Sequence, residues 1–283
     1  MSPEADLARW REHLTRFADL LGPPPDRQAP PGREPQPQRC LVFAPHPDDE
    51  CIVGALPLRL KQEAGWRVAN VAVTLGSNPE RRAARWAELR DACGVLGFEC
   101  LRPGADGLTD VRPDTAEREP ALWRSHVQAI AALLAEHRPA LVLAPHARDD
   151  NPSHIGVHHL VVEALAAARS NTVLALTEFW STQEAPNALV QTGIADTARL
   201  IAALERHAGE IERNPYHLRL PAFLADAVRR GGELVLGAGE APPDFAFATL
   251  YRLVACHGGR LAGDLPRRVF PADQALTSAL LLP

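Results

Sequence analysis

Short apolar runs alternate along this chain with longer segments in which apolar residues recur at helical spacing. The runs cover residues 41–44, 67–75, 98–101, 140–144, 171–177 and 245–255. Runs of this length, bounded by Gly, Pro, Asn and Asp, are typical of buried strands, and the periodic segments between them are typical of helices. Strands separated by helices predict an α/β fold with three layers and a mostly parallel, Rossmann-like sheet.

The first 38 residues differ in pattern from the rest. Ser2 and Pro3 resemble a helix N-cap followed by proline at the first helical position, and the apolar residues from Leu7 to Leu21 fall on one helical face. Residues 22–38 hold seven prolines without apolar periodicity, which predicts an extended connector. We therefore expect two regions, 1–38 and 39–283, with the first helix packed on the main body or on a second subunit.

Polar residues crowd together where the first strand ends. The sequence from Leu41 to Gly54 reads LVFAPHPDDECIVG, so His46, Asp48 and Asp49 lie between a buried strand and a periodic helix. Loops at the carboxyl edge of a parallel sheet are where α/β folds bind ligands. An imidazole and a carboxylate three residues apart can reach one ion, and zinc accepts this mixture of donors. The alternative, that an aspartate only caps the helix, explains one Asp and not the whole set.

A second polar segment follows the strand at 140–144. It reads PHARDDNPSHIGVHH and contains His146, Asp149, Asp150, Asn151, His154, His158 and His159 at the start of an apolar helix. Two strand ends therefore carry residues of the metal-binding type.

Composition excludes several other classes of protein. The net charge of −5 gives no electrostatic case for nucleic acid, and no apolar run has membrane-spanning length or the form of a signal peptide, so we expect a cytoplasmic location. The five cysteines form no CxxC pair and are expected to be reduced and mostly buried; Cys51 either is buried or touches the site. Neither GxGxxG nor a Walker loop is present, which disfavours a nucleotide-binding oxidoreductase or methyltransferase.

The segment Pro45-His46-Pro47-Asp48-Asp49-Glu50 resembles the signature of the LmbE/PIG-L family of zinc-dependent N-deacetylases, which act on molecules containing N-acetylglucosamine. The resemblance covers Cys40 to Thr177 and implies an LmbE-like fold for 39–283. It implies His46 and Asp49 as zinc ligands and Asp48 as general base. Residues 151–154 align with the family's His-Pro-Asp-His, so it also implies His154 as the third ligand. Fe²⁺ is a second candidate metal for such ligands.

The resemblance implies further site residues, each with an alternative. Arg85, with Glu88 three residues on, is similar to a family segment whose Arg reaches the substrate; without the resemblance the two form an ordinary surface ion pair. Asp106 of an Asp-Gly pair either bonds sugar hydroxyls or only forms a turn. Asp150 is a candidate for orienting a ligand histidine.

Asn151 stands where the family commonly has a histidine. Asparagine donates a hydrogen bond to an oxyanion but delivers no proton. His158, one helical turn after His154, and Asp48 acting first as base and then as acid are the candidate proton donors. His158 is equally well interpreted as a packed histidine.

The expected function is that of a metal-dependent hydrolase, which uses zinc-bound water to remove the N-acetyl group from an N-acetylglucosamine-containing small molecule. An amidase acting on another N-acyl or thiol-conjugate substrate and a metal-binding protein with little turnover are the alternatives. The expected partner is a small N-acetylated amino sugar, with no nucleic acid and no membrane, and a homo-oligomer is compatible with the sequence. Tyr216 and His217 either line the pocket or form a turn against a helix end.

Overall fold

The computed structural model describes residues 3–22 and 36–281 of the chain, so most of the predicted connector at 22–38 lies outside the described residues. The strands are β1 (Arg39–Ala44), β2 (Arg67–Ala72), β3 (Glu99–Leu101), β4 (Leu141–Pro145), β5 (Thr172–Thr177), β6 (Ala188–Gln191), β7 (Ala248–His257), β8 (Arg260–Asp264) and β9 (Arg268–Phe270).

The main helices are α1 (Pro3–Leu21), α2 (Asp49–Ile52), α3 (Ala55–Arg59), α4 (Arg82–Leu96), α5 (Thr115–Arg118), α6 (Pro120–His137), α7 (Pro152–Ala167), α8 (Ile194–Leu204), α9 (Ala208–Arg213), α10 (Tyr216–Gly231) and α11 (Ser278–Leu281). Single turns of other helix types are η1 (Leu60–Ala64), η2 (Pro79–Arg81) and η3 (Gly232–Leu236).

One mixed sheet runs through the molecule, with the order β3-β2-β1-β4-β5-β7-β6-β9 and β8 paired to β7. The strands from β1 to β5 are all parallel, which confirms the predicted Rossmann-like arrangement. β7 then pairs antiparallel with β5 and with β6. The short strands β6, β8 and β9 were not predicted, because each is brief. β6 and β9 also pair with residues distant in the sequence, whereas β8 forms a hairpin with β7.

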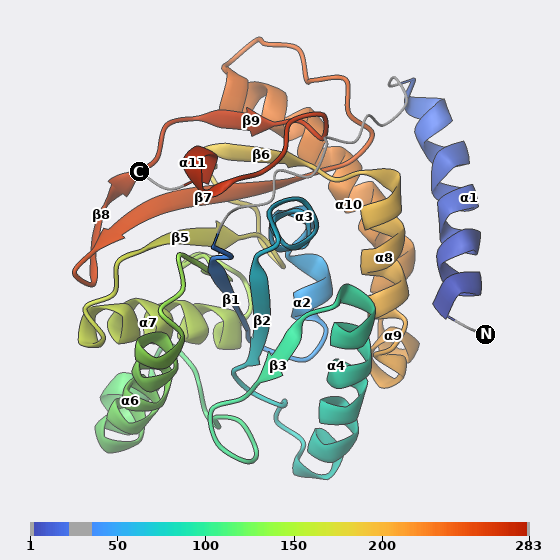
Figure 1. Ribbon diagram of the computed structural model, residues 1–283. Helices are drawn as coiled ribbons and strands as arrows, with labels where there is room; N and C mark the ends of the chain where they lie inside the picture. The colour runs from blue at the N-terminus through green and yellow to red at the C-terminus, as the bar shows by residue number, and fades with distance from the viewer. Residues whose placement is uncertain (1–2, 23–35, 282–283) are drawn as a thin grey trace.

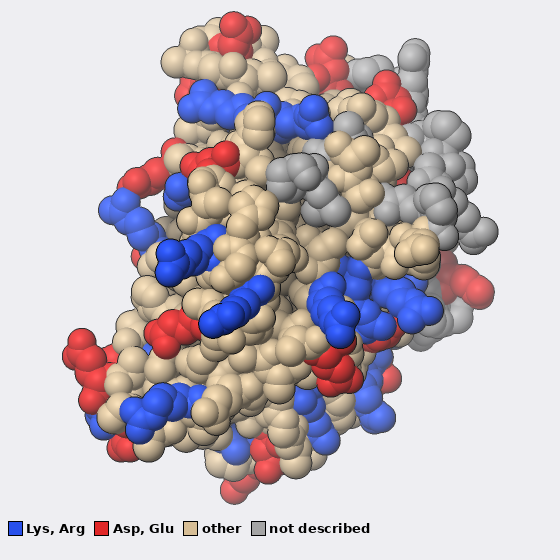
Figure 2. Space-filling view, turned by 60° about the vertical axis from the view of Figure 1, so that its left-hand side comes forward, with Lys and Arg blue, Asp and Glu red and all other residues tan. Residues whose placement is uncertain are grey.

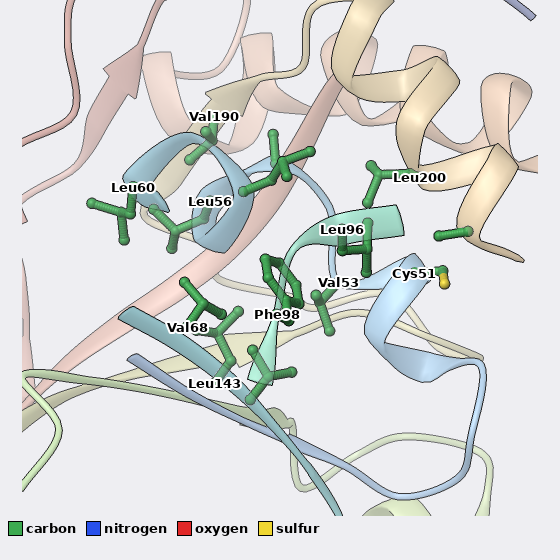
Figure 3. Close-up of a cluster of buried hydrophobic side chains, with 14 of the residues drawn as sticks. Cys51, Val53, Leu56, Leu60, Val68, Leu96, Phe98, Leu143, Val190 and Leu200 are labelled. Atoms are coloured by element: carbon green, nitrogen blue, oxygen red, sulfur yellow. The ribbon is translucent and has the colours of Figure 1, made fainter. Parts of the chain in front are cut away.

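Helices cover both faces of the sheet, as expected for three layers (Figure 1). Because successive side chains of a strand point to opposite faces, β1 contributes to two cores. Leu41 and Phe43 belong to the core shared with α6 and α7. Cys40 and Val42 belong to the larger core shared with α3, α4 and α8. Figure 3 shows part of this larger core, where Val68 of β2 and Leu143 of β4 lie near Leu56 of α3.

The strand order reverses at β1. The chain runs from β1 to β2 on one side and β3 beyond it, then returns to β4 on the other side of β1. The loops that leave β1 and β4 therefore diverge at their carboxyl ends, which is the position where open α/β sheets bind ligands. Both polar segments recognised in the sequence follow these two strands.

The helix predicted after the first polar segment is broken. It consists of α2, α3 and η1, and Gly54 separates the first two with a positive φ of 78°. A Cβ atom on Gly54 would lie 2.0 Å from Thr249 Oγ1 of β7, so only glycine fits this close approach. Apolar periodicity continues across this break, which is why the sequence pattern predicted one helix.

Two other boundaries differ from the prediction. The apolar pattern of residues 196–211 is that of one helix, but the segment is divided into α8 and α9, and His207 occupies the N-cap position of α9. The loop expected at 214–217 is the start of α10, with Pro215 at its N-cap. These corrections matter because α9 and the start of α10 form one side of the candidate site.

The N-terminal helix packs back onto the main body. Trp10 and Leu14 of α1 are buried in the larger core, and Asp6 pairs with Arg206 after α8 at 2.7 Å. Whether 1–38 and 39–283 behave as separate regions stays a prediction. Among the described residues, no helix is both long and apolar enough to cross a membrane.

Basic and acidic side chains are interspersed on the face of the molecule that Figure 2 shows. This distribution agrees with the small net charge of −5. That face therefore carries no broad field of one sign.

Candidate active site

A pocket of about 490 Å³ lies at the carboxyl ends of β1 and β4. It is lined from several elements: the loop after β1, the residues after β2, the start of α4, the segment 108–112, the start of α7 and the region from α9 to α10. Five predicted residues line it: His46, Asp48, Asp49, Asn151 and Arg85. His154 is buried against His46 and Asp49, so the structure brings together six of the eight predicted site residues.

Three side chains converge at the floor of the pocket. Donor atoms of His46, Asp49 and His154 all lie within 4.8 Å of one another. Asp49 Oδ2 is 3.5 Å from His46 Nδ1 and 3.4 Å from His154 Nε2. Two donors each about 2.1 Å from a tetrahedral zinc ion lie roughly 3.4 Å apart. The spacing of the three groups therefore fits one metal ion.

The local chain explains why His46 and Asp49 face the same point. The backbone N–H of His46 donates to Asp49 Oδ2 at 2.8 Å across the turn that begins α2. This bond fixes the carboxylate beside the imidazole of the same segment. Burial raises the pKa of Asp49, but the charges of His154 and His46 outweigh burial and lower the pKa overall.

His154 is fully buried in the first turns of α7. Neither ring nitrogen has a hydrogen-bond partner among the described residues, although Asp149 Oδ2 lies 3.6 Å from Nδ1. Phe179 packs edge-on against the ring, with centroids 4.8 Å apart. Burial lowers the pKa of His154, but the charges of Asp49 and Asp149 raise it above its ordinary value. A buried imidazole with two unsatisfied nitrogens fits a metal ligand well, because an ion would satisfy one of them.

Asp48 lies beside this group with an unusual backbone. Its φ is 122° and ψ is −28°, a region that costs a residue with a side chain about 1–3 kcal/mol. It stands at the N-cap position of α2, yet its side chain makes no capping hydrogen bond. The helix-cap alternative for Asp48 is therefore wrong. Burial, with the charge of Asp49, raises the pKa of Asp48 well above its usual value, and Arg85 opposes this rise.

Asn151 caps α7 and also lines the pocket. Its Oδ1 accepts a hydrogen bond from the backbone N–H of Ser153 at 2.9 Å. The donor that this side chain can offer to the pocket is consequently its Nδ2 group. A hydrogen bond from this Nδ2 group to an oxyanion is the interaction predicted from the sequence.

Arg85 lines the pocket, but its contacts are mainly with the protein. Its Nη2 donates to Pro47 O at 3.0 Å and its Nε lies 3.4 Å from Glu210 Oε1. The guanidinium passes so close to Gly76 that a Cβ there would lie 2.2 Å from Nη1. Glu88 does not line the pocket and accepts a bond from Gly209 N instead.

The structure places three predicted residues elsewhere. His158 Nδ1 lies 2.8 Å from Pro145 O. Its side chain lines a different pocket, together with His146. Asp106 is exposed and is not among the pocket-lining residues. Asp150 is also exposed, and the carboxylate beside His154 is Asp149.

The physical reason for the difference at Asp106 is the course of its loop. Gly156 of α7 has no side chain, and a Cβ there would lie 2.6 Å from Val111 O. The chain at 108–112 therefore packs directly on α7, and Leu108 to Arg112 line the pocket. Asp110, four residues after Asp106, is the acidic residue of this loop that reaches the pocket.

Sequence reasoning missed several contributors from one region. Glu210 and Arg213 line the pocket, and His207 contacts Glu50 beside it. The only signal was the polar character of residues 205–217, which suits any surface loop. Tyr216 had been considered as a lining residue, and it is one; His217 is not among the residues lining this pocket.

Comparison with known proteins agrees with this geometry. The family model described as PIG-L, GlcNAc-PI de-N-acetylase, matches residues 41–165, the stretch that carries both polar loops. Residues 41–165 form a PIG-L family domain. The match confirms the resemblance recognised in the signature from Pro45 to Glu50.

One curated protein is similar to part of this chain. The 1D-myo-inositol 2-acetamido-2-deoxy-alpha-D-glucopyranoside deacetylase of Thermomonospora curvata is 29% identical over 154 residues, which are 45% of this chain and 52% of that protein. The match thus spans about half the length of the curated relative.

Two solved structures share the fold. The N,N'-diacetylchitobiose deacetylase of Pyrococcus horikoshii aligns with a TM-score of 0.55 and 16% identity, covering 78% of this chain and 84% of its own. GalB, the 4-carboxy-2-hydroxymuconate hydratase of Pseudomonas putida, aligns with a TM-score of 0.57 and 17% identity, covering 81% and 99%. Because one fold carries a deacetylase and a hydratase, activity must be inferred from the site.

Proposed function

We propose that this chain is a metal-dependent hydrolase that removes the N-acetyl group from a small molecule containing N-acetylglucosamine. The observation that carries the proposal is the convergence of His46, Asp49 and the buried His154 at the pocket that His46, Asp48 and Asp49 line. Two imidazoles and one carboxylate are a set found in hydrolytic zinc sites, where further positions stay open for water and substrate. The family of residues 41–165 and the name of the curated relative support the same reaction.

His46, Asp49 and His154 are the residues that would hold the metal, for which we propose Zn²⁺, with Fe²⁺ as the alternative. When bound, the metal supplies Lewis acidity that polarises the amide carbonyl and acidifies water.

Asp48 is the residue we propose as general base. Its carboxylate lies in the pocket and would accept a proton from the attacking water as the water oxygen bonds to the amide carbon. The same carboxylate would return that proton to the amine nitrogen as the C–N bond breaks, releasing acetate and a free amine. We leave His158 out of this scheme, because it lines the other pocket.

Asn151 is the residue we propose for stabilising the oxyanion. Its Nδ2 group is free of the helix cap that Oδ1 makes. A hydrogen bond aimed at the oxygen that gains charge lowers the barrier to the reaction. Asn151 would therefore stabilise the oxyanion in place of a histidine at this position, while Asp48 would transfer the proton from the water to the amine.

The arginines of the pocket favour a substrate with a negative group beyond the sugar. Arg82 and Arg112 line the pocket from α4 and from the segment 108–112. Arg82 makes a hydrogen bond to Gly76 O at 3.4 Å and no ion pair with a carboxylate of the described residues. A phosphate or carboxylate on the aglycone would supply the missing partner.

Acetate release from a panel of N-acetylglucosaminyl compounds, measured with added zinc and with chelator, tests the proposal. Release that requires metal and is lost in His154→Ala, but kept in His159→Ala, supports it; His159 is exposed on the same helix. Metal-dependent cleavage of other N-acyl or thiol-conjugate substrates in place of acetate release would identify a different amidase. Metal binding without cleavage of any of these compounds would identify a binding protein and refute the proposal.

A further inference from the structure

The peptide bond between Pro47 and Asp48 is held at both of its polar ends. Its carbonyl oxygen, Pro47 O, accepts a hydrogen bond from Arg85 Nη2 at 3.0 Å. Its N–H group, on Asp48, donates to Glu50 Oε2 at 3.0 Å. The C=O and N–H of a planar trans peptide point in opposite directions, so two bonds of this kind fix the orientation of the peptide plane.

This orientation decides where the Asp48 side chain points. Asp48 has a φ of 122°, a conformation that residues with a Cβ atom adopt only when their surroundings impose it. Asp48 is buried at the pocket, and its carboxylate is the group proposed to move the proton. If the peptide rotated, the carboxylate would leave its place beside the cluster formed by His46, Asp49 and His154.

His207 holds Glu50, the residue that accepts the hydrogen bond from the Asp48 N–H group. Its Nε2 lies 2.6 Å from Glu50 Oε1, and both side chains are fully buried. Cys51 Sγ donates to the same oxygen at 3.3 Å. A buried carboxylate is costly unless donors surround it, and here Glu50 has donors on both oxygens. The distance of 2.6 Å is that of a hydrogen bond, so His207 and Glu50 satisfy each other directly.

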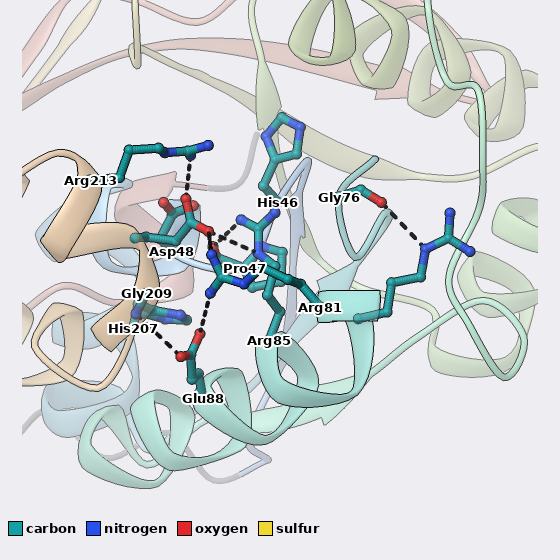
Figure 4. Close-up of polar contacts among 12 residues, drawn as sticks. His46, Pro47, Asp48, Gly76, Arg81, Arg85, Glu88, His207, Gly209 and Arg213 are labelled. Carbon is teal, nitrogen blue, oxygen red and sulfur yellow. Dashed lines mark hydrogen bonds and ion pairs between the residues drawn. The ribbon is translucent and has the colours of Figure 1, made fainter. Parts of the chain in front are cut away.

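Glu210 holds Arg85, the residue that donates the hydrogen bond to Pro47 O. Its Oε1 lies 3.4 Å from Arg85 Nε, and its side chain is 3% exposed. Arg81 and Arg213 pair with the same carboxylate. Figure 4 shows Arg81 of η2 and Arg85 and Glu88 of α4 reaching toward Gly209 and Arg213 of α9, beside Asp48.

The two residues that hold Glu50 and Arg85 come from one short segment. His207 is the N-cap of α9 and Glu210 lies in its first turn, three residues later. We propose that this segment is a positioning element for the proposed hydrolysis: His207 through Glu50, and Glu210 through Arg85, fix the peptide that carries Asp48. Arg85 is in this scheme a positioning residue, and its contact with substrate is secondary. The inference rests on the proposed role of Asp48.

Amide hydrogen exchange at Asp48, measured by NMR on the metal-free protein, tests the geometry without any substrate. His207→Leu removes the donor to Glu50 at similar volume, and His207→Gln restores an N–H donor at a similar distance. The expected result is a loss of protection at the Asp48 amide of at least tenfold in His207→Leu and recovery of most of it in His207→Gln. Asn187→Leu is the matched control, because it removes three hydrogen bonds away from the pocket, two to Leu253 of β7 and one to Leu265.

The same variants, loaded with zinc, give the functional readout. His207→Leu should lower kcat at least tenfold, leave KM within twofold and leave the metal content unchanged, while Asn187→Leu lowers the melting temperature without lowering kcat. Combining His207→Leu with Glu50→Gln should cost no more than the larger single loss, because the two residues act in one chain of contacts.

Three outcomes would overturn the inference. One is unchanged Asp48 protection in His207→Leu; another is unchanged kcat in that variant of an active wild type. The third is a second bound metal that His207→Leu removes, since donor atoms of Glu50, Cys51 and His207 also lie within 4.8 Å of one another. A wild type that hydrolyses none of the tested compounds refutes the proposed function instead, and the exchange data still decide whether His207 holds the peptide.

Discussion

Asp149 lies against the imidazole of His154: Asp149 Oδ2 is 3.6 Å from His154 Nδ1, and neither side chain is exposed to solvent. Asp149 is itself fixed, because its two oxygens accept hydrogen bonds from the backbone N–H groups of Asn151 and Trp180. A carboxylate behind a ligand histidine sets the ring orientation and raises the basicity of the other nitrogen. Asp149 is thus placed to direct His154 Nε2 toward Asp49.

Replacing this carboxylate should weaken metal binding. Asp149→Asn keeps the volume and one acceptor oxygen but removes the charge. We expect zinc affinity to fall about 10-fold to 100-fold, the usual effect of removing such a partner. Competition with a chromogenic chelator measures the change. Asp150→Asn is the control, because Asp150 is exposed and should leave the affinity unchanged; equal losses in both variants would refute the role of Asp149.

Metal should stabilise the native protein through the three converging residues. An ion that binds only the folded state at 100 times its dissociation constant adds about 2.7 kcal/mol to the free energy of unfolding. We expect urea unfolding of the wild type to show this gain with zinc and none in His154→Ala. A gain of equal size in that variant would mean that the ion binds elsewhere on the chain.

The first polar loop and the first five strands were predictable, because both are local patterns. The run from Leu41 to Ala44 is apolar throughout, and His46 and Asp49 follow it within five positions. Placing two such loops after β1 and β4 needs only the rule that parallel strands present their carboxyl ends at one edge.

The positioning contacts were not predictable, because they join residues far apart in the sequence. His207 is 157 positions from Glu50, and Glu210 lies 125 positions after Arg85 and pairs with Arg81, 129 positions away. No periodicity or motif links them, and the boundary between α8 and α9 that places His207 was hidden inside one apolar pattern. Asp106 lies outside the pocket for a related reason: only the close approach of Val111 to Gly156 decides which acid of the loop reaches the pocket.

Gly54 provides a test of the break between α2 and α3. Gly54→Ala should destabilise the protein by about 2 kcal/mol or more, because it combines a positive φ with a Cβ placed 2.0 Å from Thr249 Oγ1. Gly94→Ala is the matched comparison: Gly94 lies within α4 with open space around it, so alanine should stabilise by about 0.5–1 kcal/mol. Chemical denaturation measures the change in unfolding free energy of both variants, and the two changes should have opposite signs. No change in Gly54→Ala would contradict the close packing of α2 against β7.

The N-terminal helix should contribute to the stability of the main body. Leu14 of α1 is fully buried, so Leu14→Ala should cost about 2–5 kcal/mol of unfolding free energy. Leu20 on the same helix is 85% exposed, and Leu20→Ala should change stability by less than about 0.5 kcal/mol. If Leu14→Ala proves as mild as Leu20→Ala, α1 does not pack on α8 in solution.

The proposed preference for a negatively charged substrate predicts a role for Arg82. This side chain lines the pocket from the start of α4, and within the described part of the chain it donates one hydrogen bond, to the carbonyl oxygen of Gly76. Arg82→Gln should raise KM about tenfold for substrates whose aglycone carries a phosphate or carboxylate, equivalent to about 1.4 kcal/mol, and leave KM for neutral substrates within twofold. Arg90→Gln on the exposed side of the same helix is the control for the loss of one positive charge. Steady-state kinetics on a charged and a neutral substrate compare the two variants. Because a general electrostatic effect would act equally in both, an equal rise of KM in Arg90→Gln would show that Arg82 makes no direct contact with the anion.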